Sequence, residues 1–160
     1  MSDVRELMKE VELVAIRPVV TFARLSTGPV PELGAAFENQ FNVSIGFARA
    51  SELEFAVVFK VDCRSRRTRA EKPFARYVYQ VAVQYRAPRA WPDEIVSQFA
   101  NMNTPVHAWP YARQFVHSSS VQLGLHPLLL PALRVGQPPS GTHAVSPEPT
   151  GTPKAKPADG

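Results

Sequence analysis

Apolar residues occupy every second position in each of three stretches of the chain, 41–47, 53–63 and 77–85. Successive side chains of a β-strand point to opposite faces, so each stretch predicts a strand with one buried and one solvated face. Strands of this kind pair into antiparallel sheets that pack one face on a core. The apolar positions are Phe41, Val43, Ile45 and Phe47; Leu53, Phe55, Val57, Phe59, Val61 and Cys63; and Tyr77, Tyr79, Val81, Val83 and Tyr85.

An earlier stretch, Glu12 to Leu25, is rich in β-forming residues but less regular. Pro18 interrupts it, which predicts an edge strand or a β-bulge, because proline donates no hydrogen bond to a sheet. The connection 26–40 is too long for a tight hairpin and is predicted to be a crossover loop, a kind of loop that is often functional. The connection 48–51 has hairpin length, and the connection 64–73 is longer.

The pattern becomes helical after the last predicted strand. Residues 93–99 can form a short helix with acidic residues in its first turn. Thr104 followed by Pro105 predicts the start of a second, long helix that runs to about Val121. Pro110 removes one backbone hydrogen bond and should bend this helix, and Gly124 is a plausible stop.

The fold class that follows is α+β: a four-stranded antiparallel sheet with a crossover loop, then a long bent helix and a short segment rich in leucine and proline. We predict that residues 1–135 form one domain, which is long enough to bury a stable core. Residues 136–160 are rich in proline and glycine and contain no large aromatic residue. We predict a disordered tail there.

No compartment signal is visible in the sequence. Residues 1–11 mix charged with isolated apolar residues, and no apolar run approaches the roughly 20 residues of a membrane helix. The single cysteine, Cys63, allows no intramolecular disulfide. These features predict a cytoplasmic protein that does not insert into membranes.

The formal net charge is +4, and its excess is concentrated in one basic loop. Such a patch can attract nucleic acid, an anionic lipid or an acidic protein, or it can be a solvated hairpin. A row of tyrosines nearby, Tyr77, Tyr79 and Tyr85, could stack bases, although the same residues fit an ordinary sheet face. A nucleic-acid-binding module is therefore the alternative from another functional class. The loop residues are Arg64, Arg66, Arg67, Arg69 and Lys72, with Arg76 beyond them.

The sequence contains no recognisable catalytic or metal-binding motif. Cys63 ends an apolar row, which favours packing over nucleophilic catalysis. No histidine has the spacing to cysteine or carboxylates that a metal site needs, and no glycine-rich phosphate loop is present. We therefore predict no enzymatic activity, no cofactor and no metal. The histidines are His107, His117, His126 and His143.

The string Trp109-Pro110-Tyr111-Ala112-Arg113 is the most specific motif of the chain. It follows four predicted strands and precedes a Leu/Pro segment, which we define as Leu123–Leu133. In this motif and this order of elements, residues 13–133 resemble the SecB-like protein-export chaperones, and the chain is identified as a divergent, basic member.

The resemblance implies a homotetramer, built as a dimer of dimers, that binds unfolded polypeptides without ATP. In export such proteins pass precursors to SecA, and some relatives instead protect an antitoxin, so a role dedicated to a single partner is the main alternative. Export members are acidic where they meet SecA. This chain has Arg17 and Arg24 in its first strand and Lys154 and Lys156 in its tail, which weighs against SecA.

A holdase of this kind needs exposed apolar side chains that contact a client at many points. The candidates lie in the crossover, the bent helix and the Leu/Pro segment, where each could equally belong to the core or to the tetramer interface. Tyr111 and Arg113 are interpreted as structural, and Arg113 should find a carbonyl or a carboxylate such as Glu52 or Glu54. The client-binding candidates are Phe37, Phe41, Trp109, Leu123, Leu125, Leu128, Leu129 and Leu130.

Overall fold

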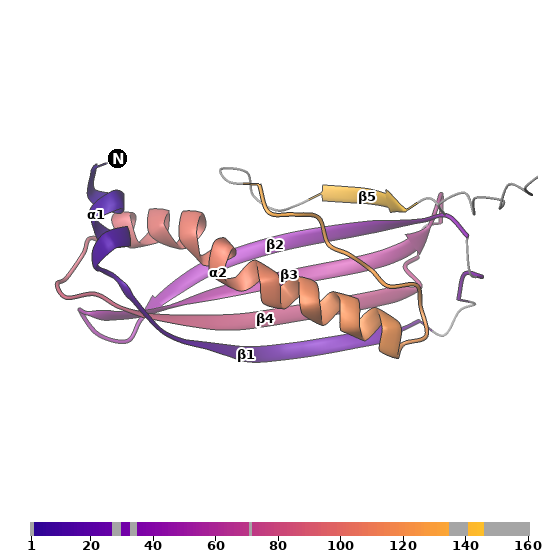
Figure 1. The fold of residues 1–160 in the computed structure, drawn as a ribbon, viewed down its shortest axis with the longest axis horizontal. Coiled ribbons are helices and arrows are strands. Elements are labelled where there is room, and N and C mark those ends of the chain that lie inside the picture. The colour runs from indigo at the N-terminus through magenta and orange to yellow at the C-terminus, as the bar shows by residue number, and fades with distance from the viewer. Residues whose placement is uncertain (1, 27–29, 33–34, 71, 135–140, 146–160) are drawn as a thin grey trace, which may run out of the picture.

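A long helix crosses one face of an antiparallel sheet, so the chain has the predicted α+β fold (Figure 1). The computed structural model describes residues 2–26, 30–32, 35–70, 72–134 and 141–145. In chain order the elements are α1 (Ser2–Glu10), β1 (Glu12–Leu25), β2 (Phe37–Arg49), β3 (Glu54–Arg67), β4 (Ala75–Arg86), α2 (Asp93–Gln122) and β5 (Gly141–Val145).

The sheet has the strand order β1-β4-β3-β2-β5, with antiparallel pairing throughout. The crossover between β1 and β2 therefore carries the chain from one side of the β4–β3 pair to the other. Strand β1 lies at the edge, and its register with β4 shifts between Pro18 and Val20. Both consequences predicted from Pro18 are thus found in the same strand.

Strands β2 and β3 are longer at one end than the apolar alternation predicts. The ladder extends to the pair Phe37–Arg67, so Phe37 and Phe41 belong to β2 and not to the crossover. The pattern is hidden there because two polar residues face the core. Asn39 and Ser65 are both buried, and the Ser65 hydroxyl donates to Asn39 Oδ1 at 2.6 Å.

The predicted pair of helices is one continuous helix, α2. Thr104 was expected to cap a helix start, but it is buried within α2, where its hydroxyl lies 3.2 Å from that of Tyr85. The threonine–proline pair reads as a start because proline suits the first turn of a helix. Here the helix continues past Pro105, and Thr104, Pro105 and Ala108 are all buried. The helix α2 changes direction midway along its length (Figure 1).

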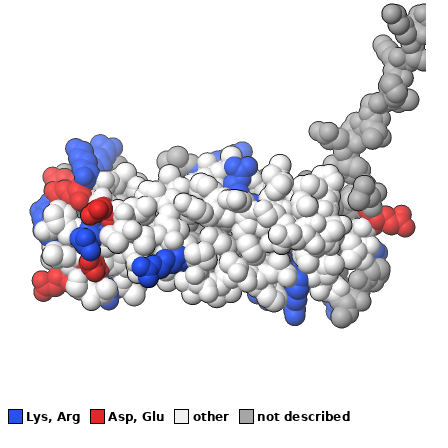
Figure 2. Space-filling model, turned by 60° about the horizontal axis from the view of Figure 1, so that its bottom comes forward, with Lys and Arg blue, Asp and Glu red and all other residues white. Residues whose placement is uncertain are grey.

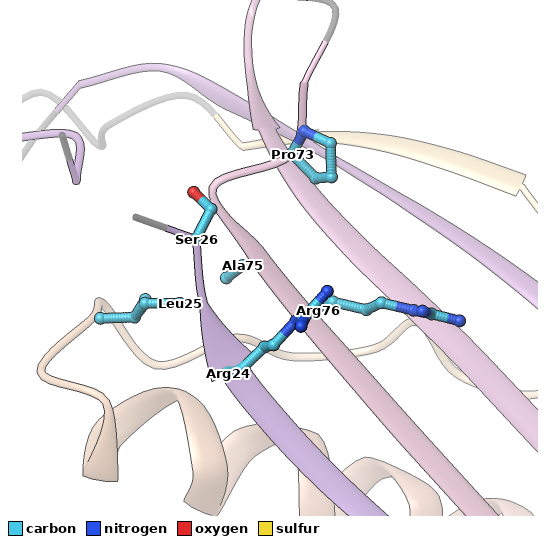
Figure 3. A pocket seen from close by; sticks show the side chains of 6 residues that line it. All are labelled: Arg24, Leu25, Ser26, Pro73, Ala75 and Arg76. Carbon is cyan, nitrogen blue, oxygen red and sulfur yellow. The ribbon is translucent and has the colours of Figure 1, made fainter. Parts of the chain in front are cut away.

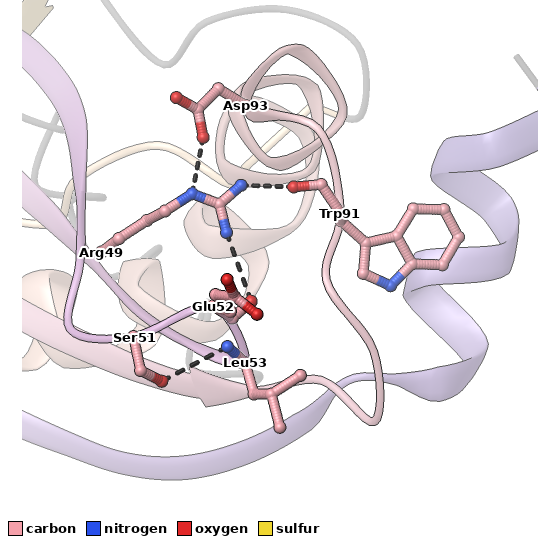
Figure 4. Close-up of polar contacts among 6 residues, drawn as sticks. All are labelled: Arg49, Ser51, Glu52, Leu53, Trp91 and Asp93. Atoms are coloured by element: carbon pink, nitrogen blue, oxygen red, sulfur yellow. Dashed lines mark hydrogen bonds and ion pairs between the residues drawn. The ribbon is translucent and has the colours of Figure 1, made fainter.

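The two ends of α2 are fixed by different means. At its start, the Arg49 guanidinium donates to the carboxylate of Asp93 at 2.6 Å and to the carbonyls of Trp91 and Glu52 (Figure 4). At its end, Gly124 takes a left-handed φ of 73°, and its N–H donates to the Val121 carbonyl at 2.9 Å. This is the helix stop predicted from the glycine.

Helix α1 was not expected from the sequence. Its apolar face is short, with Val4 and Leu7 buried in the core beside α2. On the polar side of α1, Glu6 and Glu10 form ion pairs with Arg89, which precedes α2, at 3.2 and 3.1 Å. Val4, Leu7, Met8 and Val11 recur at helical spacing, so the sequence does contain a signal for this short helix.

Part of the predicted disordered tail is a strand. Residues Gly141–Val145 form β5 and pair with Phe37–Phe41 of β2. The prediction of a disordered tail did not include this strand. The rest of the tail prediction falls on residues 136–140 and 146–160, outside the described part of the chain. In the described residues, no helix is long and apolar enough to cross a membrane.

Candidate functional site

The Trp-Pro-Tyr-Ala-Arg motif ties the Leu/Pro segment to α2. The Trp109 indole N–H donates to the carbonyl of Pro131 at 2.9 Å, and Arg113 Nε donates to the carbonyl of Leu130 at 3.0 Å. The segment thereby runs back beside α2 without regular structure (Figure 1). Of the two kinds of partner expected for Arg113, the carbonyl is the one found.

The motif residues divide between the core and the surface. Trp109 is buried and packs against Phe41 and Phe59 at ring-centroid distances of 6.1 and 6.4 Å. Ala112 is fully buried, which allows α2 to approach the sheet closely. Tyr111, which the sequence analysis interprets as structural, is 48% exposed.

The eight client-binding candidates also divide. Phe41, Trp109, Leu128 and Leu130 are buried in the core, so their side chains offer no surface to a client. Three others are only partly buried: Phe37, Leu123 and Leu125. Leu129 stands between two buried leucines and is itself 67% exposed. The accessible candidates therefore lie along the Leu/Pro segment and at the start of β2.

Two further sets of exposed apolar side chains were not singled out by sequence reasoning. One follows edge strand β1, which is largely exposed on both of its faces. The other follows the side of α2 that faces away from the sheet. Their alternation and helical spacing are the signals of ordinary core residues, so no pattern in the sequence could mark them as exposed. The members are Leu13, Val14, Val19, Val20 and Phe22 in β1, and Met102, Val106, Tyr111 and Val121 in α2.

The charges of the molecule are unevenly placed relative to this apolar surface. Figure 2 brings the β1 side forward and shows acidic and basic side chains gathered at one end of the face. Along most of its length, only scattered basic groups interrupt the uncharged surface. Extended uncharged surface with apolar side chains is typical of an interaction site.

The predicted basic loop is mostly strand. Arg64, Arg66 and Arg67 lie in β3, and only Arg69 and Lys72 lie in the connection to β4. Arg69 has a φ of 66°, the left-handed conformation of a tight turn. The ladder continues to Arg67 because the inward-facing Ser65 finds its polar partner on β2, and this pairing was not visible in the sequence.

Asp62 joins two of the arginines on the face of the sheet opposite α2, which we call the outer face. Arg76 donates to its carboxylate through two nitrogens, at 2.6 and 3.1 Å, and Arg64 donates at 3.4 Å. Burial alone raises the pKa of Asp62, but the hydrogen bonds and charges of the two arginines outweigh this effect and lower the pKa below its ordinary value.

The tyrosine row cannot serve as a platform for bases. Tyr77, Tyr79 and Tyr85 are buried on the inner face, beneath α2. Arg64 and Arg76 alternate with inward-facing residues and therefore lie on the outer face. The arginines and tyrosines are thus on opposite sides of the sheet, and the arrangement that suggested nucleic-acid binding is not formed.

Reactive groups are either buried or isolated. Burial and the Asp62 charge raise the pKa of the Cys63 thiol to about 12, so it stays protonated at neutral pH. His107 Nδ1 lies 2.8 Å from the Tyr85 hydroxyl, and burial lowers the pKa of this histidine. No cluster of three or more metal-ligating side chains occurs among the residues that the structure describes.

Comparisons with known proteins identify the fold. No family model and no curated protein matches the sequence. Among solved structures, the chain is similar to a SecB-like chaperone of Mycobacterium tuberculosis in complex with a ChAD peptide from the HigA1 antitoxin, at 20% sequence identity and a TM-score of 0.69. The match covers 86% of this chain and 100% of the other. The protein thus has a SecB-like fold, as its helix motif predicts.

Proposed function

We propose that this protein is an ATP-independent chaperone that holds unfolded polypeptides and carries out no enzymatic reaction. The observation that carries the proposal is a SecB-like fold with apolar side chains left accessible along the Leu/Pro segment and at the start of β2. Burying an apolar side chain contributes about 1.5–3 kcal/mol. Several weak contacts of this kind along one client give useful affinity without a sequence code.

The client surface that we propose centres on the Leu/Pro segment. Leu129 projects outward while Leu128 and Leu130 anchor the backbone on either side. Leu123 and Leu125 lie at the end of α2 from which the segment departs. A leucine held this way is already ordered before a client binds, so less entropy is lost on contact. Phe41, Trp109, Leu128 and Leu130 support the surface from within.

The exposed residues of β1 and α2 suit a different role. An edge strand with apolar side chains on both faces is prone to pair with another chain unless something covers it. A second copy of this protein would cover the free edge of β1 and the outward side of α2. We propose that these elements form the homotetramer, arranged as a dimer of dimers with the helices between the sheets.

A single dedicated partner is the second candidate function. The SecB-like protein of similar fold binds an antitoxin peptide, which favours an antitoxin or similar partner here. A general holdase would instead bind many precursor proteins in the cytoplasm before their export. The basic outer face weighs against SecA as the next partner in that route. Co-purification would distinguish these two functions, because a dedicated chaperone should retain one small partner protein.

Suppression of aggregation tests the proposed client surface. The protein should prevent a reduced, denatured client from aggregating without any nucleotide, and Leu129→Asp should weaken this effect by about tenfold, because a charge would be buried on contact. Leu53→Asp is the matched control, since Leu53 is also an exposed leucine but lies in the β2–β3 turn. Equal loss in both variants, or no loss in Leu129→Asp, would contradict the proposed surface.

A further inference from the structure

The outer face carries a row of three arginines that no feature of the holdase explains. Arg76 of β4 lies directly opposite Arg24 of β1 and directly opposite Arg64 of β3. Like charges in such cross-strand positions destabilise a sheet. We propose that Arg24, Arg64 and Arg76 form a binding site for the carboxylates of an acidic polypeptide segment.

The row is short of negative charge. Asp62 is the only carboxylate that pairs with these arginines in the described residues, and it serves both Arg76 and Arg64. Arg24 has no carboxylate partner there, and its guanidinium instead lies 5.5 Å from the centroid of the Phe22 ring. Three guanidinium groups against one carboxylate leave two positive charges on a small area, and an anionic ligand would neutralise them.

The arginines have unequal freedom to bind. Two nitrogens of Arg76 are already occupied by Asp62, so its guanidinium is held in place. The Arg64 contact to Asp62 is longer, at 3.4 Å, and the Arg24 side chain makes no hydrogen bond within the described chain. Arg24 and Arg64 should therefore contact the ligand directly, while Arg76 adds its charge between them. Arginine suits this task because its planar fork binds a carboxylate through two hydrogen bonds.

A cavity of about 270 Å³ opens at the Arg24 end of the row (Figure 3). It is lined by Leu25, Ser26, Pro73 and Ala75 together with Arg24 and Arg76, and the Leu25 side chain projects away from the two arginines (Figure 3). Leu25 and Ala75 pair on the inner-face register, so the proposed carboxylate site rests on the arginine row itself.

The surroundings favour a polypeptide over a nucleic acid. The row spans two inter-strand spacings, about 10 Å, whereas alternate side chains of an extended peptide lie about 7 Å apart. Two carboxylates of such a peptide can reach Arg24 and Arg64 together. Nucleic-acid binding would instead need many phosphate contacts and available aromatic rings.

Fluorescence anisotropy with a labelled ten-residue peptide of alternating glutamate and valine tests the site. The double substitution Arg24→Gln/Arg64→Gln should weaken binding by at least about tenfold, since it removes two charge-assisted contacts. Arg17→Gln is the matched control, because Arg17 lies on the outer face of the same strand, opposite Ala82. This control should bind within about twofold of the parent protein.

Three results would overturn the proposal: unchanged affinity in the double variant, equal loss in Arg17→Gln, or tighter binding of a single-stranded oligonucleotide of equal charge. Thermal unfolding of each variant shows that lost binding is not lost folding. Holding of an unfolded client should remain unchanged in Arg24→Gln/Arg64→Gln. Failure of the acidic-peptide site and failure of the chaperone function are thereby distinguished.

Discussion

The two faces of the sheet are built from the same strands but obey different constraints. On the inner face, Val57, Phe59 and Val61 of β3 are fully buried beneath α2. On the outer face, the residues that alternate with them include Lys60 and Asp62, which remain partly exposed. The inner face must fill space to native density, which restricts its residues to apolar ones of suitable shape. The outer face is free of this demand, and its arginine row can therefore serve a partner.

Aromatic rings supply much of the inner packing. Tyr85 stacks on Phe55 with ring centroids 5.3 Å apart, and Phe99 of α2 meets Tyr85 edge-on at 5.0 Å. Aromatic pairs in these geometries add to the stabilisation that comes from burial alone. Substitutions on the inner face should therefore affect folding, and those on the outer face should affect binding.

Trp109→Ala should have the largest effect on stability. It removes the packing on Phe41 and Phe59 and leaves the Pro131 carbonyl without its donor, which should lower the free energy of unfolding by about 3–5 kcal/mol. Urea denaturation followed by circular dichroism measures this loss. Gln80→Ala on the outer face of β4 is the control and should change stability by less than about 0.5 kcal/mol. Equal losses would contradict the contrast between the faces.

Acid should destabilise the inner face through His107. Because burial lowers the pKa of His107 from its ordinary value of 6.5, the unfolded chain binds its proton more readily than the folded protein does. The free energy of unfolding should therefore fall as the pH drops below about 6.5. His107→Gln should remove this part of the pH dependence in denaturation between about pH 7.5 and about pH 5.5. An unchanged profile in the variant would count against this origin.

Asp62→Asn should have the smallest effect on stability. Its lowered pKa means that its stabilising contribution is present above the ordinary pKa of 3.8 and is lost as the pH falls through the folded value. At neutral pH the substitution should cost less than about 1 kcal/mol, because the pair is partly exposed. The cost should shrink in high salt, whereas a salt-independent loss in denaturation would point to packing instead. If the arginine row binds acidic segments, the same variant should bind the glutamate–valine peptide more tightly.

The inner face could be predicted from the sequence because its signal is local. The alternation of Phe55 to Cys63 places every second residue inward, and all of these predicted core positions are buried. The alternation fails at Asn39 and Ser65, whose side chains can hydrogen-bond to each other only once the strands are paired. The strand ends, and with them the placement of Phe37 and Arg64, could therefore not be read from either strand alone.

The candidate site was harder to predict because exposure is not a local property. Positions 128, 129 and 130 are all leucine, and the contacts of Trp109, Arg113 and Ser120 with the segment decide which of the three side chains faces out. The arginine row likewise depends on strand register, since Arg24 and Arg76 are far apart in the chain. Long-range pairing, and not composition, determines both surfaces.

Size-exclusion chromatography with light scattering tests the central claim most directly. The protein is run alone, with a reduced and unfolded client, and with the native form of the same client at moderate salt. If the protein is a holdase, a tetramer should co-elute with the unfolded client and should not bind the native form. A monomer that leaves the unfolded client unbound would contradict the chaperone account.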